Sequence, residues 1–124
     1  MLSLSKINTP LAICRLDPTS AVPDWAFSGP LACVTRTQEE LSIVCSAQSA
    51  PADIQCERDW QALKVDGPLD FSLVGVLAAL AGLLAQAGIS LFAISTFDTD
   101  YILVRGDRFD QAVAVLQQAG YSIR

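Results

Sequence analysis

The sequence predicts an α+β fold in which two helices cover one face of an antiparallel sheet. Three observations carry this prediction: the second half has the element order β-α-β-β-α-β, residues 71–97 contain no charged side chain, and Gly or Pro residues separate neighbouring elements. Because 52% of the 124 residues are hydrophobic, the chain can also bury a sizeable core. The expected architecture is the ferredoxin-like split βαβ arrangement.

The complete set of elements is expected in the second half of the chain. In order, they are strand 62–65, helix 72–87, strand 89–96, strand 101–104, helix 107–120 and strand 121–123. Asp70 and Ser72 are both candidate N-caps of the first helix, and Gly88 is the candidate C-terminal cap. Asp107 is the candidate cap of the second helix. The two middle strands are expected to pair as a hairpin.

The uncharged segment 71–97 is long enough to cross a membrane. It also contains the polar residues Gln86 and Ser90, and Gly88 breaks it before a stretch of β type. A helix buried against a central strand explains the missing charge without a membrane, because both elements are then shielded from water. The N-terminus has no signal-peptide pattern, so we predict a cytoplasmic protein with no membrane partner.

The first half predicts a looser version of the same unit. A strand at 11–17, a Pro-containing connection, a hairpin of strands 31–37 and 41–45, a loop or short helix at 47–53 and a weaker strand at 55–60 are expected in this order. We therefore expect a degenerate unit at residues 1–61 and a complete unit at residues 62–124, in tandem on one chain.

Charge and composition exclude several classes of function. The chain has 13 acidic and 8 basic residues and a net charge of −5, which disfavours nucleic acid as a partner. The absence of His removes imidazole chemistry. The cysteines, at positions 14, 33, 45 and 56, form no CxxC pair, so we expect buried, reduced cysteines, no metal and no cofactor.

One long stretch of sequence resembles a known family. GPLDFSLVGVLAALAGLLAQAGISLFAISTFDTDYILV, at 67–104, resembles the ACT domains of small bacterial tandem-ACT proteins, of aspartate kinases and of an animal cytosolic arginine sensor; residues 85–104 are the most specific part. CVTRTQEELSIVC, at 33–45, is similar to a hairpin of the sensors. The resemblance implies a regulatory, non-enzymatic domain that responds to an amino acid, with any catalytic partner on a separate chain.

An amino acid is a zwitterion, so its site needs hydrogen-bond donors for the carboxylate and acceptors for the ammonium group. The start of the first predicted helix supplies backbone N–H groups, and Asp98 and Asp100 lie in the facing turn. The resemblance adds Asp100 as a ligand contact, with residues 95–97 beside it. The expected ligand-binding residues are Asp70, Phe71, Ser72, Leu73, Gly75, Ser95, Thr96, Phe97, Asp98 and Asp100. Leu73 stands where the sensor has an acidic residue, so arginine is not singled out as the ligand.

Other interpretations stay open on the sequence alone. Asp70 is equally suited to capping a helix, Asp98 and Asp100 to a hairpin turn, and Gly75 to close approach of another helix. A module that forms dimers or docks on a separate enzyme, without a small ligand, is the main alternative. An Asp98–Asp100 dyad for acid–base or metal chemistry is a third, for which no third ligand is evident. A homodimer is expected both for an amino-acid-binding domain and for an association module without a ligand.

Overall fold

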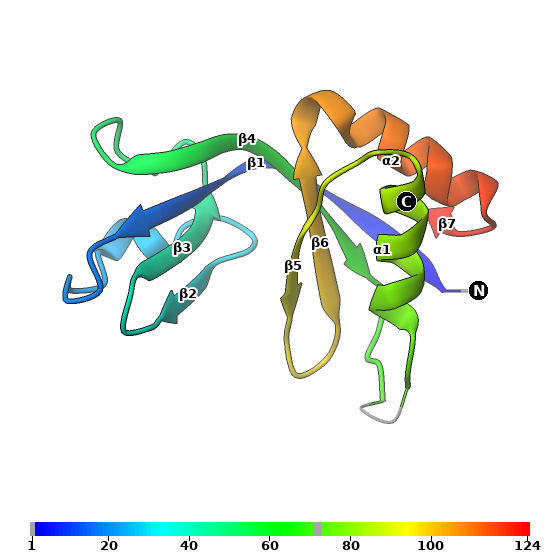
Figure 1. Cartoon of the computed structure of the whole chain (residues 1–124), viewed down its shortest axis with the longest axis horizontal. Helices are drawn as coiled ribbons and strands as arrows, with labels where there is room; N and C mark the ends of the chain where they lie inside the picture. Colours follow the sequence, from blue (N-terminus) through cyan, green and yellow to red (C-terminus); the bar gives the residue numbers. More distant parts are fainter. Residues whose placement is uncertain (1, 71–72) are drawn as a thin grey trace. The chain divides into compact units, whose positions relative to one another are not determined.

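The structure is a computed structural model that describes residues 2–70 and 73–124 (Figure 1). The elements are β1 (Ser3–Leu16), η1 (Asp24–Phe27), β2 (Cys33–Arg36), β3 (Leu41–Ser46), β4 (Gln55–Val65), α1 (Val76–Gln86), β5 (Phe92–Ser95), β6 (Asp100–Arg105), α2 (Gly106–Gln118) and β7 (Ser122–Ile123). The predicted α+β class is confirmed. Phe71 and Ser72, two of the expected ligand-binding residues, lie outside the described residues.

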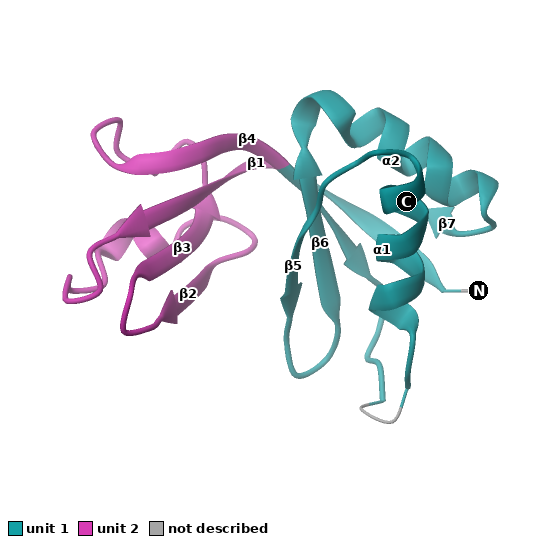
Figure 2. Cartoon of the chain, in the orientation of Figure 1, with its two compact units in different colours: residues 1–8, 61–124 teal, residues 9–60 magenta. Residues whose placement is uncertain are grey.

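The chain divides into two compact units (Figure 2). Unit 1 comprises residues 1–8 and 61–124, and unit 2 comprises residues 9–60. The first eight residues thus belong with the C-terminal half, whereas the sequence suggested one division near residue 61. The reason is that β1 and β4 are longer than expected, and each contributes residues to both units.

Unit 1 has the element order β4-α1-β5-β6-α2-β7, which is the predicted β-α-β-β-α-β. Its strands lie in the order β5-β6-β4-β1, with β7 next to β1. β5 and β6 form the expected antiparallel hairpin. One edge differs from the prediction, because β7 pairs with β1 in parallel, with Ser3 opposite Ser122. The N-terminal part of β1 therefore lies beside β7 at this edge, although it was not predicted as a strand.

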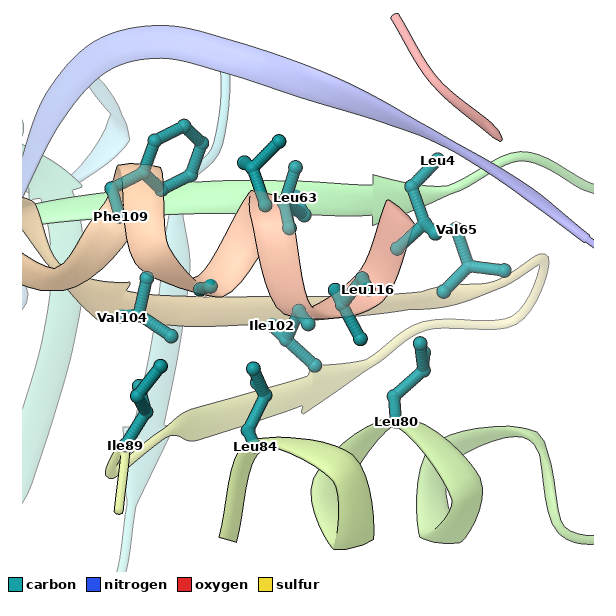
Figure 3. Packing of buried hydrophobic residues seen from close by; sticks show 12 residues of the cluster. Leu4, Leu63, Val65, Leu80, Leu84, Ile89, Ile102, Val104, Phe109 and Leu116 are labelled. Atoms are coloured by element: carbon teal, nitrogen blue, oxygen red, sulfur yellow. The ribbon is translucent and has the colours of Figure 1, made fainter. Parts of the chain in front are cut away.

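Both helices of unit 1 pack on the same face of the sheet (Figure 3). The core cluster takes alternate residues from the strands, including Ile102 and Val104, since side chains two apart point to one face. Leu80 and Leu84 of α1 are fully buried and point into the space that Ile102 and Leu116 also fill. Each such side chain contributes about 1.5–3 kcal/mol through burial. This packing accounts for the uncharged segment. No helix within residues 2–70 and 73–124 is long and apolar enough to span a membrane.

Helix α1 starts later than predicted. Its first residue is Val76, and Gly75 occupies the N-cap position with φ of 82°, in the left-handed region where L side chains are strained. Asp70 is therefore not the N-cap; its carbonyl oxygen instead accepts a hydrogen bond from the Leu73 amide. The predicted end is confirmed: Gly88, with φ of 73°, follows the C-terminus of the helix.

Unit 2 has strands in the order β2-β3-β1-β4 and very little helix. The four-residue η1 is its helical part, and residues 47–54 form turns. Arg58 fixes those turns, because its guanidinium donates to the carbonyl oxygens of Ala47, Ala50 and Pro51 over 3.1, 3.3 and 2.7 Å. One side chain thus satisfies three carbonyl groups of these turns.

The structure corrects the prediction for two cysteines. Cys14 in β1 and Cys56 in β4 form a disulfide bond, 42 residues apart in sequence. The expectation of four reduced cysteines is therefore wrong, because adjacent strands bring together two residues that no short-range motif connects. Cys33 and Cys45 are free, and burial raises the pKa of the Cys45 thiol.

Candidate functional site

A cavity of about 320 Å³ lies in unit 1, between the N-terminal end of α1 and the turn that joins β5 to β6. Its volume is suited to a small molecule. The lining residues are Leu69, Asp70, Leu73, Gly75, Val76, Leu77, Ala78, Ser95, Thr96, Phe97, Asp98, Thr99 and Asp100. Every expected ligand-binding residue that the structure describes is among them.

Sequence reasoning did not single out five of the lining residues: Leu69, Val76, Leu77, Ala78 and Thr99. Three of these form the first turn of α1, and they were missed because the helix was expected to begin near Ser72. Gly75 was the available signal, since a glycine directly before an apolar helical stretch is suited to a left-handed N-cap. Thr99 was read only as a turn residue between two aspartates.

One side of the cavity is rich in hydrogen-bond acceptors. Asp98 and Asp100 come from the β5–β6 hairpin, Asp70 from the segment before α1, and the described lining residues of the cavity include no Lys or Arg. Asp100 is half-buried, and its Oδ1 accepts a 2.6 Å hydrogen bond from the Ser95 hydroxyl. Asp98 is exposed. Carboxylates on the wall of a cavity favour a positively charged group.

The opposite side supplies donors. The backbone N–H groups of Val76, Leu77 and Ala78 form the first turn of α1, ahead of the first helical bond from the Ala79 amide to the Gly75 carbonyl oxygen. Such first-turn amides have no partner within a helix, and Gly75 offers no side-chain cap. The positive end of the helix dipole lies at the same place. Of the predicted donors at 71–73, the Leu73 amide is the one within the described residues, and it donates to the Asp70 carbonyl oxygen.

Two of the residues that line the cavity have large, exposed apolar side chains. Leu73 is 52% exposed and Phe97 is 78% exposed, and both line the cavity. Val74, next to Leu73, is 90% exposed. Large hydrophobic side chains left in solvent mark a place where another molecule can bind.

Two other possibilities receive no support from the geometry. Across the described part of the chain, no group of three or more His, Cys, Asp or Glu side chains is placed to hold a metal ion. A second hollow, of about 520 Å³, is lined by Ala81, Ala85, Gly88, Ile89, Ser90 and Leu91. It has no charged side chain among these residues, so it is poorly suited to a zwitterion.

The ACT-domain model of known families matches residues 55–118, which is more than half of the chain. A second model, described as an N-terminal domain, matches residues 10–53. The chain therefore belongs to the ACT-domain family, a family of regulatory domains, and the resemblance noted in the sequence is confirmed.

Relatives and solved structures agree with this assignment. The human cytosolic arginine sensor for mTORC1 subunit 1 is 36% identical over 86 residues, which are 63% of this chain and 26% of the sensor. The chain thus spans about a quarter of the length of the curated relatives it matches. A crystal structure of a protein from Agobacterium tumefaciens has a TM-score of 0.94 at 35% identity, covering 99% of this chain and 92% of that one. The aspartokinase alpha and beta subunits share the fold, with a TM-score of 0.66 at 17% identity and coverage of 94% and 96%.

Proposed function

We propose that this protein binds a free amino acid in the cavity between α1 and the β5–β6 turn, and that it reports the bound state by associating with another protein chain, such as an enzyme. The observation that carries the proposal is the opposition of acceptors and donors across one cavity. Asp98 and Asp100 line the same cavity as Val76, Leu77 and Ala78 of the first turn of α1, in a chain that belongs to a family of regulatory domains. The relatives named arginine sensors support an amino acid as the ligand class.

The proposed binding mode assigns each end of a zwitterion to one wall. The ammonium group pairs with Asp98 and Asp100, and the Ser95 hydroxyl holds Asp100 in place. The α-carboxylate accepts hydrogen bonds from the α1 amides at 76–78, where the helix dipole favours a negative charge. The side chain of the ligand then lies near Leu73 and Phe97. Acidic amino acids are disfavoured, because the lining already carries three carboxylates.

The test is a thermal-unfolding panel with each of the twenty standard amino acids. A ligand present at 100 times its dissociation constant stabilises the folded protein by about 2.7 kcal/mol, which is visible as a raised Tm. We expect one or a few neutral or basic amino acids to raise the Tm, and aspartate and glutamate to leave it unchanged. A flat panel would contradict the proposal.

Association without a small ligand is the second candidate, and the exposed Leu73, Val74 and Phe97 side chains favour it. In this interpretation these three apolar side chains contact a second copy of the chain or a partner enzyme directly. Val74→Ser would weaken self-association measured by light scattering, while leaving the Tm nearly unchanged because Val74 is exposed. Such an effect together with a flat amino-acid panel would favour this candidate.

We also infer that unit 2 is a degenerate ACT-like unit, so that two units follow each other in tandem. The strand order supports this inference. In unit 2, β2 lies at one edge, followed by β3 and then β1; in unit 1, β5 lies at one edge, followed by β6 and then β4. In both units the second strand of the repeat is thus followed by the third and then the first. Unit 2 has lost helix rather than strands. The expected division at 1–61 and 62–124 describes this repeat along the sequence, and the shared strands β1 and β4 explain why the compact units differ from it.

A further inference from the structure

Thr99 is a buried polar residue in the turn between β5 and β6. Its side chain is 4% exposed, and its hydroxyl donates to the Val65 carbonyl oxygen over 2.6 Å. This bond joins positions 34 residues apart, from the turn to the end of β4. A buried hydroxyl is unfavourable unless it is hydrogen-bonded, so the contact fixes where the turn lies.

Further contacts hold the same turn. The Thr96 amide donates to the Thr99 carbonyl oxygen over 2.8 Å, and the Thr99 amide donates to Thr96 Oγ1 over 3.3 Å. On the other side, the Leu69 amide donates to the Asp98 carbonyl oxygen over 2.7 Å. A Cβ atom on Gly67 would lie 3.2 Å from that carbonyl oxygen and 3.3 Å from the Thr99 Cβ, so the segment after β4 is packed tightly on the turn.

We propose that Thr99 is a positioning residue for the amino-acid site: its hydroxyl, bonded to β4, holds the turn so that the flanking Asp98 and Asp100 face the first turn of α1. This inference rests on the proposed function and deepens it. Asp98 and Asp100 immediately flank Thr99 in sequence, and all three line the cavity. A shift of the Thr99 backbone therefore moves both carboxylates at once, whereas the first-turn amides of α1 stay with the helix. Binding both ends of one zwitterion requires the two walls to keep their spacing.

Thr99→Val and Thr99→Ser separate the hydroxyl from the shape of the side chain. Valine keeps the β-branched shape and removes the donor to Val65, while serine keeps the donor and removes a methyl group. Without ligand, hydrogen exchange followed by NMR should show faster exchange of the Thr96 amide in Thr99→Val, and protection restored in Thr99→Ser. Val113→Ala, which shortens a core side chain of α2, is the matched destabilised control. In this variant the Thr96 amide should exchange no faster than the lower global stability of the variant requires. Unchanged protection in Thr99→Val would overturn the positioning role.

A second arm measures binding by titration calorimetry, with each of the twenty standard amino acids as the probe. Any amino acid that binds the wild-type protein should bind Thr99→Val about 10-fold more weakly, and Thr99→Ser and Val113→Ala within about 2-fold. Equal affinity in wild type and Thr99→Val would overturn the positioning role and leave the proposed function intact. If no amino acid binds the wild type, the proposed function fails, and the exchange experiment still decides whether Thr99 holds the turn.

Discussion

Ser95 and Asp100 lie directly opposite each other in the β5–β6 hairpin, and the Ser95 hydroxyl donates to Asp100 Oδ1 over 2.6 Å. The pair stands where the hairpin leaves the sheet to form its turn. The bond sets the orientation of the carboxylate, and the second oxygen keeps its capacity to accept. The carboxylate of Asp100, at the first residue of β6, is thereby an oriented group on the cavity wall.

Removal of the Asp100 charge should weaken amino-acid binding strongly. We expect Asp100→Asn to lose about 1–2 kcal/mol of binding free energy, because the ammonium group of the ligand loses a half-buried carboxylate partner. Ser95→Ala should lose about 1 kcal/mol, since Asp100 then loses one hydrogen bond that orients it. Titration calorimetry measures both. Asp107→Asn, an acidic position in the first turn of α2, is the control; equal losses there would show a general charge effect instead.

Gly75 and Gly82 offer a matched test of the N-terminus of α1. An added Cβ would meet no atom of residues 2–70 and 73–124 within 4 Å at either position, so the comparison rests on their backbone conformations. Gly75→Ala should destabilise the protein by about 1–2 kcal/mol, because Gly75 has φ of 82°. Gly82→Ala, inside α1, should stabilise it by about 0.5–1 kcal/mol. Denaturant unfolding measures both; a stabilising Gly75→Ala would contradict the left-handed N-cap.

Asp66 makes the stability of unit 1 depend on pH. Hydrogen bonds from Ser5 and Ser3, together with Arg124, lower the pKa of Asp66 from 3.8 to about 2. A carboxyl group with a lower pKa in the folded state stabilises the fold above its unfolded pKa, and this contribution is lost as the pH falls through the folded pKa. The Tm difference between wild type and Asp66→Asn should therefore be full at pH 6, shrink as the pH falls below the unfolded pKa, and be largely lost at pH 2.

Ser5→Ala supplies the control for this pH dependence. Because the Ser5 hydroxyl is the largest cause of the shift, its removal should raise the Asp66 pKa towards 3.8, as followed by carboxyl-carbon NMR. A Tm difference between wild type and Asp66→Asn that persists unchanged at pH 2 would show that Asp66 acts through packing rather than through its charge.

The disulfide should stabilise the fold by restricting the unfolded chain. For a sequence separation of 42 residues, the chain-entropy relation gives about 4 kcal/mol. A Cys14→Ser and Cys56→Ser double variant should therefore lower the midpoint of denaturant unfolding, with the largest increase in hydrogen exchange within unit 2. Cys33→Ser, at a free cysteine, should leave the midpoint unchanged. An equal midpoint in the double variant would mean that the bond does not form in solution.

The pattern of the second half predicted much of unit 1, because local signals and tertiary packing agree there. The hairpin of β5 and β6, the end of α1 at Gly88 and the apolar face of α2 all follow from spacing and turn residues. The strand at residues 3–8 was missed since it pairs with β7 at the far end of the chain. Pairing between strands so far apart in sequence has no local sequence signal apart from the alternation of apolar and polar residues.

The candidate site was predictable on its acceptor wall and less so on its donor wall. The positions of Asp98 and Asp100 could be predicted from the hairpin, because neighbouring residues in the sequence determine its turn. The donors depend on where α1 begins, and Gly75 displaces that start to Val76. The Cys14–Cys56 bond and the Thr99–Val65 contact could not be predicted from the sequence, because each joins residues that only the folded sheet brings together.

The most direct test of amino-acid binding in this cavity is an NMR titration of the wild-type protein with the amino acid that raises the Tm most. The amide signals of Val76, Leu77, Ala78, Ser95, Thr96, Asp98 and Asp100 should shift in a saturable way with one dissociation constant. Asp100→Asn should reduce the shifts at subsaturating ligand. Saturable shifts confined to the second hollow at residues 81–91, or no shifts with any amino acid, would contradict the account.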